Sequence, residues 1–279
     1  MTTTPKIRFE GVGKTFPRRD RGPRRDPIAP RHVTALHDIE LSVAPGEFTV
    51  IVGPSGCGKS TLLDLLGGLD HPTTGRVLVD GEPVTGPGPD RGTVFQQYAL
   101  LPWRTALGNI EFGLEATGVP RHERRERARE FLDLVGLDGF GDRHPHALSG
   151  GMRQRVAIAR SLAYDPDVLL MDEPFGALDA QTRESLQDEL LRIWRRTGKT
   201  VVFITHGIDE AVLLGERVAV LTSRPGRVKE VLPITLEGRD DTGDPRSSPE
   251  FTRHRRRVWE LLHDEVDRAR EVEREAAAA

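Results

Sequence analysis

The sequence predicts an α/β protein with a mostly parallel sheet that is covered by helices on both faces. Residues 168–171 form a short apolar run that is followed by a helical pattern at 180–196, and the same order returns at 200–204 and 208–214. A further apolar run ends at glycine and precedes another helical stretch within residues 48–66. Strands separated by helices are typical of parallel sheets, because each crossover must pack back onto the sheet.

The N-terminal part contributes additional strands. Residues 6–12 alternate apolar and polar side chains, and residues 33–43 form a second strand candidate. Residues 76–80 and 93–96 are predicted to be two more strands. Between the first two strands, residues 18–31 carry six arginines among Pro, Gly and Asp, which predicts a solvated loop. A small antiparallel piece is therefore expected near the N-terminus.

The middle of the chain is predicted to be helical, and the end returns to strands. Residues 106–135 have helical spacing, and the block at 121–130 alternates charge sign, which favours an exposed helix face. The remaining expected elements are a helix at 151–164, strands at 217–221 and 228–236, a polar linker at 238–249, and a helix whose apolar stripe begins at Phe251.

Composition excludes several classes of protein. The chain has 279 residues, 37% hydrophobic and 30% charged, which suits one large or two small globular domains. The formal net charge of -3 gives no global basic field for nucleic acid. No apolar run approaches the ~20 residues of a membrane-spanning helix. The first residues lack a signal-like stretch, and the single cysteine, Cys57, excludes an internal disulfide, so a reducing cytoplasm is expected.

The first chemical motif lies between the apolar run at 48–52 and the helical stretch from Lys59. Glycines there let backbone N–H groups wrap a phosphate chain, and the helix N-terminus adds a favourable dipole. Lys59 supplies a cation near the outer phosphates, and the Ser60 hydroxyl suits Mg²⁺. We expect Cys57, at this helix N-terminus, to have a lowered thiol pKa and to be chemically addressable. The predicted phosphate-binding residues are Gly53, Pro54, Ser55, Gly56, Cys57, Gly58, Lys59, Ser60 and Thr61.

The second motif is the buried strand at 168–171 that delivers Asp172 and Glu173 at its end. Sheets of this class place ligands at the carboxyl ends of their strands. Asp172 is predicted to hold Mg²⁺, usually through water. Glu173 is predicted to orient and activate the attacking water.

The third motif, at residues 148–155, reads Leu-Ser-Gly-Gly-Met-Arg-Gln-Arg. Ser149, Gly150 and Gly151 at a helix start form a second anion-binding end. A single nucleotide site already has its phosphate loop. A second phosphate-binding element in the same chain therefore suggests a composite site built by two subunits. The motif resembles the signature sequence of ABC ATPases, whereas a P-loop kinase or GTPase would not explain it.

The resemblance to the ABC family covers residues 7 to about 236. It implies an ABC nucleotide-binding domain, with a P-loop core sheet, a helical subdomain and a small antiparallel β subdomain. Gln96 matches the Q-loop glutamine, which senses Mg²⁺ and the membrane partner, and Asp179 closes the D-loop at 175–179. His206 matches the switch histidine. Phe16 is the candidate for the ring that stacks on adenine.

Finer strings at 98–104, 174–180 and 223–227 are similar to the nitrate/sulfonate/taurine importer ATPases. This resemblance implies ATP and Mg²⁺ as cofactors, and a second copy of the chain bound head to tail. It also implies integral membrane permease subunits, an extracytoplasmic solute-binding protein acting indirectly, a place at the cytoplasmic face of the membrane, and no nucleic-acid partner. The expected organisation is an ATPase domain at 1–237, with a helical subdomain at about 98–164 and an Arg-rich loop at 17–32, followed by a linker and C-terminal amphipathic helix at 238–279.

One alternative keeps the ABC ATPase but changes its partner. A soluble ABC ATPase could act on DNA or ribosomes, and the Arg-rich loop is the only feature that favours it. Such relatives usually carry tandem cassettes or a long coiled-coil insertion, and this chain shows neither. His144 and His146 have a spacing possible for metal ligands, but no Cys or carboxylate cluster accompanies them, so no further metal site is predicted.

Overall fold

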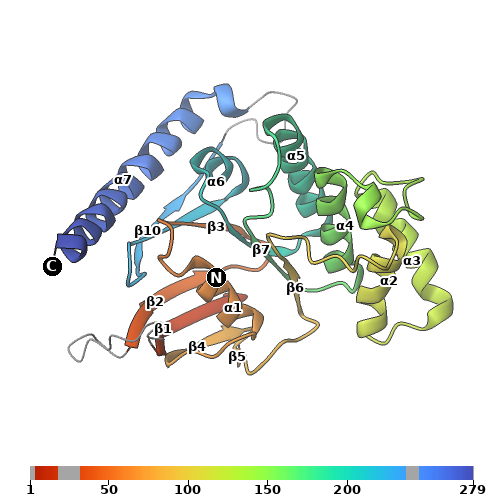
Figure 1. Ribbon diagram of the computed structural model, residues 1–279, viewed down its shortest axis with the longest axis horizontal. Helices are drawn as coiled ribbons and strands as arrows, with labels where there is room; N and C mark the ends of the chain where they lie inside the picture. The colour runs from red at the N-terminus through yellow and green to blue at the C-terminus, as the bar shows by residue number, and fades with distance from the viewer. Residues whose placement is uncertain (1–3, 18–31, 237–244, 279) are drawn as a thin grey trace. The chain divides into compact units, whose positions relative to one another are not determined.

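The computed structural model describes residues 4–17, 32–236 and 245–278, with side chains described as far as Arg268. The chain forms two compact units. The first comprises Met1–Ala44, Val50–Gly86 and His206–Ala279, and the second comprises Pro45–Thr49 and Pro87–Thr205. Figure 1 labels their elements where there is room. The arginine-rich segment at 18–31 and most of the polar linker predicted at 238–249 lie outside the described residues.

An antiparallel sheet in the first unit confirms the small β subdomain predicted near the N-terminus. Its order is β2-β1-β4-β5. Strand β1 runs further than the alternation at 6–12 predicts, because its residues remain paired with β2 as far as Pro17. The strands are β1 (Ile7–Pro17), β2 (His32–Val43), β4 (Thr74–Val79) and β5 (Glu82–Pro83).

The first unit also contains the strands and helices around the predicted phosphate loop. Strand β9 pairs antiparallel with β10 and neighbours the C-terminal part of β3. The long helix α7, labelled in Figure 1, contacts α6 and β9. These elements are β3 (Phe48–Val52), whose first two residues belong to the second unit, α1 (Lys59–Gly67), α6 (Ile208–Leu214), β9 (Arg217–Leu221), β10 (Val228–Pro233), the short η2 (Pro245–Ser247) and α7 (Pro249–Ala278).

The second unit holds three parallel strands and the helical region. Strand β7 pairs in parallel with β6 on one side and β8 on the other. Strands β7 and β8 are almost fully buried, as parallel strands covered on both faces should be. The elements are β6 (Arg91–Val94), α2 (Ala106–Ala116), α3 (Arg121–Leu134), η1 (Pro145–Ala147), α4 (Gly150–Ala163), β7 (Val168–Asp172), α5 (Ala180–Thr197) and β8 (Thr200–Ile204).

Local chemistry explains where these helices begin and end. The helical pattern at 106–135 is divided because Gly118 has a φ of +79° and Pro120 precedes α3. Aromatic packing joins strands and loops in the core. In the core of the second unit, the Phe203 ring centroid lies 5.9 Å from that of Phe48 and 5.8 Å from that of Phe175.

Candidate functional site

The predicted phosphate loop connects β3 to α1 in the first unit. Gly58, at the N-cap of α1, has a φ of +99°, which is a conformation that residues with a Cβ rarely adopt. The first four N–H groups of an α-helix have no partner within the helix, so the start of α1 can donate to an anion. Ser60 and Thr61 lie in this first turn. The strand–loop–helix context that the sequence predicts is therefore present.

Lys59 is held within its own loop. Its side chain is buried, and Nζ donates to the carbonyl oxygens of Gly53 at 2.8 Å and Pro54 at 3.2 Å. The ammonium group is thus kept at the loop by backbone acceptors. Both of these acceptors are neutral carbonyl oxygens, so the positive charge of Lys59 can act on a phosphate.

The prediction of an addressable Cys57 thiol is wrong. Cys57 is only 1% exposed, and burial raises its thiol pKa above the ordinary value. The positive charge of Lys59 lowers the pKa, but by less than burial raises it. Desolvation disfavours the thiolate more than the nearby cation and helix start favour it, so the thiol is expected to be unreactive.

The second motif lies at the end of β7 in the second unit. Asp172 is the last residue of that strand, and Glu173 follows in the left-handed region with a φ of +42°. The Glu173 N–H donates to the carbonyl oxygen of Ile204 at 2.9 Å. Gln96, two residues beyond β6, places Nε2 3.5 Å from Glu173 Oε2. Parallel register thus brings together Gln96 and Glu173, which are 77 positions apart in the sequence.

The third motif begins α4 in the same unit. Ser149 is the N-cap, and its Oγ accepts a hydrogen bond from Met152 N–H at 3.2 Å. Gly150 and Gly151 form the first turn. A Cβ on Gly151 would lie 2.6 Å from Thr182 Cγ2, so this glycine lets α4 approach α5 closely. The sequence motif indicated an anion-binding end but not this packing role.

Asp179 caps the neighbouring helix α5. Its Oδ1 accepts from Thr182 N–H at 3.0 Å, and this backbone hydrogen bond lowers the pKa of the Asp179 carboxyl. The carboxylate is therefore ionised at neutral pH. The aspartate that the resemblance assigns to the D-loop thus has an observed structural role as an N-cap.

Two predicted site residues lie elsewhere in the first unit. Phe16, near the end of β1, is 38% exposed, and the ammonium of Lys14 lies 5.1 Å from its ring centroid. An accessible aromatic face is what stacking on a base requires. His206 is exposed and lines a cavity of about 560 Å³ together with Arg255 and Trp259 of α7.

The oxygen donors available suit Mg²⁺. This ion keeps several waters and usually takes only one or two protein carboxylates plus substrate phosphates. Ser60 in the first unit carries a hydroxyl oxygen, and Gln96 and Asp172 in the second unit carry an amide and a carboxylate oxygen, which are ligand types that this ion accepts. Across the described parts of the chain, no group of three or more His, Cys, Asp or Glu residues could hold a metal ion. The rings of His144 and His146, whose spacing would suit metal ligands but for which no metal site is predicted, stack on each other with centroids 5.8 Å apart.

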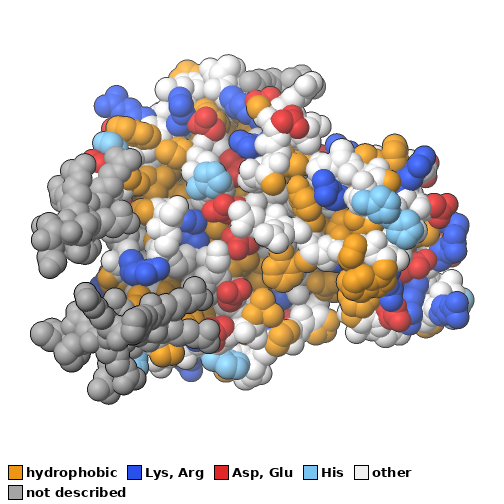
Figure 2. All heavy atoms as spheres, in the orientation of Figure 1, with side chains coloured by type: hydrophobic (Ala, Val, Ile, Leu, Met, Phe, Trp, Pro, Cys, Tyr) orange, Lys and Arg blue, Asp and Glu red, His pale blue; other side chains and the backbone are white. Residues whose placement is uncertain are grey.

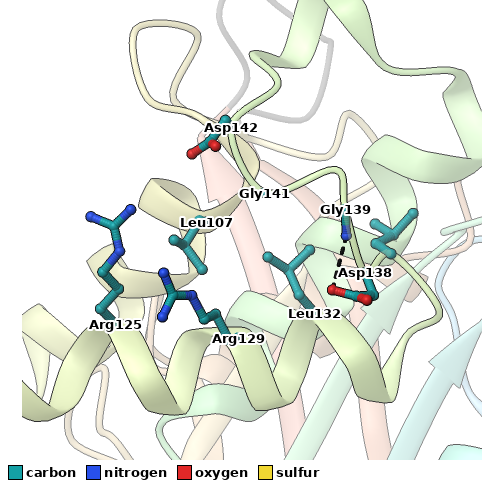
Figure 3. A pocket seen from close by; sticks show the side chains of 9 residues that line it. Leu107, Arg125, Arg129, Leu132, Asp138, Gly139, Gly141 and Asp142 are labelled. Carbon is teal, nitrogen blue, oxygen red and sulfur yellow. Dashed lines mark hydrogen bonds between the residues drawn. The ribbon is translucent and has the colours of Figure 1, made fainter.

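A separate small pocket lies within the helical part of the second unit (Figure 3). Arg125 and Arg129 extend into it from α3, opposite the segment that carries Asp138 and Asp142, and its volume is about 230 Å³. None of the predicted nucleotide-site residues lines this pocket.

Among the described helices, none combines the length and apolar character needed to cross a membrane.

Comparison with known proteins identifies the family. The family model described as ABC transporter matches residues 36–176. An uncharacterized ABC transporter ATP-binding protein of Methanocaldococcus jannaschii is 58% identical over 84% of this chain and 86% of its own. The nitrate import ATP-binding protein NrtD of Synechocystis is 50% identical over 88% and 93%. The taurine import ATP-binding protein TauB of Pseudomonas putida is 53% identical over 80% and 87%.

Solved structures support the same family. A dimeric ATP-binding cassette in a post-hydrolysis state, bound to ADP and Pi, is 37% identical, with a TM-score of 0.68 over 82% of this chain and 99% of its own. A second dimeric structure, of a bacterial ABC transporter cassette, is 38% identical with a TM-score of 0.69. This chain therefore belongs to the ABC transporter family, as an ATP-binding subunit with ATPase activity.

Proposed function

We propose that this chain powers an ABC importer that takes up a small anion of the nitrate, sulfonate or taurine type. The observation that carries the proposal is the high sequence identity to relatives that are named as importers. Relatives at 50–53% identity are named as nitrate and taurine import ATP-binding proteins. An ATPase subunit does not contact the transported solute, so its sequence reflects the solute only through descent.

In this proposal the loop from Gly53 to Thr61 binds the phosphates of ATP, and Phe16 stacks on the adenine. Lys59 contacts the outer phosphates. Ser60, Gln96 and Asp172 hold Mg²⁺, which neutralises charge on the phosphoryl group when bound.

Glu173 orients the attacking water and accepts its proton, and His206 contacts the transferred group. Phosphoryl transfer depends mainly on positioning and charge stabilisation, which fixed side chains and backbone dipoles supply.

We propose that two copies complete each site. The N-terminus of α4, with Ser149, Gly150 and Gly151, would face the nucleotide held by the other copy, and Asp179 would lie nearby. Two solved relatives are dimeric cassettes, which supports this assembly. ATP binding closes the dimer, and hydrolysis followed by product release reopens it.

A groove in the second unit is proposed to receive the membrane permease. The cavity has a volume of about 930 Å³, and Phe95, next to Gln96, lies on its wall with Phe112 and Tyr164. Phe95 is 40% and Phe112 39% exposed, and both line the same cavity, so they form an apolar patch of the kind that a partner covers. In Figure 2, hydrophobic side chains gather over α2 and near β6. A helix from the permease at the cytoplasmic face of the membrane would fit these apolar walls.

The test is capture of the permease subunits and reconstitution with them. Phe112→Glu should abolish binding of the permease, whereas Phe140→Glu should not, because Phe140 is comparably exposed at 42% in the same unit but lies outside the groove. In proteoliposomes, nitrate, taurine or an alkylsulfonate delivered by the solute-binding protein should stimulate ATP hydrolysis. Salt-dependent DNA binding with no permease binding would instead favour a soluble ABC ATPase.

A further inference from the structure

A buried carboxylate holds the C-terminal helix α7 against the rest of the first unit. Glu265 is only 1% exposed. Its Oε2 accepts from the Ser223 N–H at 3.0 Å and faces the Ser223 hydroxyl at 3.4 Å. Its Oε1 lies 2.9 Å from Lys229 Nζ and 2.9 Å from Arg268 Nη1. The two oxygens thus face four hydrogen-bond donors. A carboxylate can accept from all of them, whereas the NH₂ group of an amide is itself a donor and cannot.

The charge of Glu265 is stabilised in place. Burial by itself would raise the pKa of this carboxyl, but hydrogen bonds from Lys229 and the Ser223 N–H outweigh burial, and the pKa lies below the ordinary value. Glu265 is therefore ionised at neutral pH. Since a buried charge is tolerated only when it is well paired, the contact to Ser223 depends on the carboxylate and its partners together.

Ser223 begins a tight loop, residues 223–227, that joins β9 to β10. The side chain of Thr222 makes two hydrogen bonds within this loop. Its Oγ1 donates to the Pro225 carbonyl oxygen at 3.1 Å and accepts from the Arg227 N–H at 3.0 Å. The Thr222 N–H also donates to the Arg227 carbonyl oxygen at 2.9 Å. A loop with this many internal hydrogen bonds should move as one piece.

The same loop lies against the back of the phosphate loop. Arg224 Nε donates to the Gly56 carbonyl oxygen at 3.2 Å. Gly226 N–H donates to the Ala35 carbonyl oxygen at 2.8 Å, and a Cβ added at Gly226 would overlap the carbonyl oxygen of Cys57. Loop 223–227 thus contacts two consecutive residues of the phosphate loop, Gly56 and Cys57.

We propose that Glu265 is a positioning residue for the nucleotide site, and that α7 sets the affinity for ATP by holding loop 223–227 against the phosphate loop. The proposal rests on the proposed role of Gly53–Thr61 in binding phosphate. It gives a function to the C-terminal helix and to the string at 223–227, neither of which the hydrolysis mechanism uses. The path has three contacts: Glu265 to Ser223, Ser223 to Arg224 within the loop, and Arg224 to Gly56.

Two substitutions test the path from opposite ends. Glu265→Gln keeps the side-chain shape but places an NH₂ group, which can only donate, against the hydrogen-bond donors of Ser223, Lys229 or Arg268. Arg224→Ala removes the hydrogen bond to Gly56 from an exposed residue, so it should leave the fold intact. Glu260→Gln is the matched control, because Glu260 lies on the same helix and pairs with Arg256 rather than with loop 223–227.

The measurements are the Kd of the purified chain for MgADP, the KM and kcat for ATP hydrolysis, and the Tm without nucleotide. We expect Glu265→Gln and Arg224→Ala each to raise Kd and KM about fivefold, at the low end of coupling between sites. The change in kcat should be less than about twofold, since the catalytic groups are not touched. The double variant should show less than the product of the two single effects, because both interrupt one path.

The outcomes separate the two proposals. If the wild-type chain binds MgADP and both variants bind it equally well, α7 does not position the site. A lowered Tm with unchanged Kd in Glu265→Gln would assign Glu265 a purely structural role and overturn the inference, and so would effects that multiply fully in the double variant. If the wild-type chain binds no MgADP, the proposed phosphate site itself fails.

Discussion

Replacing Lys59 with alanine should remove nearly all nucleotide-dependent activity while leaving the fold intact. The ammonium group makes two hydrogen bonds, to the carbonyl oxygens of Gly53 and Pro54. Losing two such bonds costs roughly 1–3 kcal/mol of the free energy of unfolding. The apolar core residues around α1, such as Leu62 and Leu66, are untouched, so the unit should remain folded.

The functional loss should be larger than the loss of stability. A fixed cation beside a developing negative charge contributes roughly 3–4 kcal/mol to the transition state. Each factor of ten in rate corresponds to about 1.4 kcal/mol. Removing this electrostatic contribution should therefore lower ATP turnover by roughly two to three orders of magnitude in Lys59→Ala.

Phosphate release and thermal unfolding measure the two effects separately. MgATP at about 100 times its Kd stabilises a protein by about 2.7 kcal/mol, or roughly 5–10 °C in Tm for a chain of this size. If Lys59→Ala weakens binding about a hundredfold, the same MgATP should raise its Tm by only roughly 1–2 °C. Lys6→Ala is the control, since Lys6 lies in the same unit and pairs with Asp80. A folded Lys59→Ala protein with near-wild-type turnover would show that Lys59 does not contact the phosphates.

Four further predictions address other parts of the chain. Glu173→Gln should bind ATP but hydrolyse it at least about a hundredfold more slowly, because an amide cannot accept a proton from water. In a mixed dimer, Ser149→Glu on one chain should disable the nucleotide held by the other, as cross-linking to a nucleotide analogue would report; loss confined to its own chain would refute the composite site. Maleimide should label Cys57 slowly in the native protein and rapidly in urea, because the thiol is buried with a raised pKa. Fast native labelling would contradict that burial. Phe203→Ala should cost roughly 3–5 kcal/mol of unfolding free energy in urea titration, since the ring is fully buried between two others; a cost below ~1 kcal/mol would mean that the core relaxes to fill the cavity.

The sequence by itself determined the features that depend on local chemistry. Glycines and a lysine between a buried strand and a helix specify the phosphate loop, because few residue types allow that backbone path. Ser149 could be placed at a helix start because its short oxygen-bearing side chain caps the N-terminus of α4, whereas the N-cap role of Asp179 on α5 emerged only in the structure. Alternating apolar strands and helical patterns were enough to predict the parallel strands β6, β7 and β8.

Only the tertiary structure decided the features that depend on what surrounds a residue. Helix position alone predicted a reactive Cys57, but packing of the phosphate loop buries the thiol and raises its pKa. The contact between Gln96 and Glu173 follows from strand register, which no local pattern contains. Glu265 lies on an amphipathic helix where a charged residue would ordinarily face solvent, yet Ser223 and Lys229 enclose it. Burial and long-range hydrogen bonds are set by residues far away in the chain, and for that reason the sequence pattern around each residue could not reveal them.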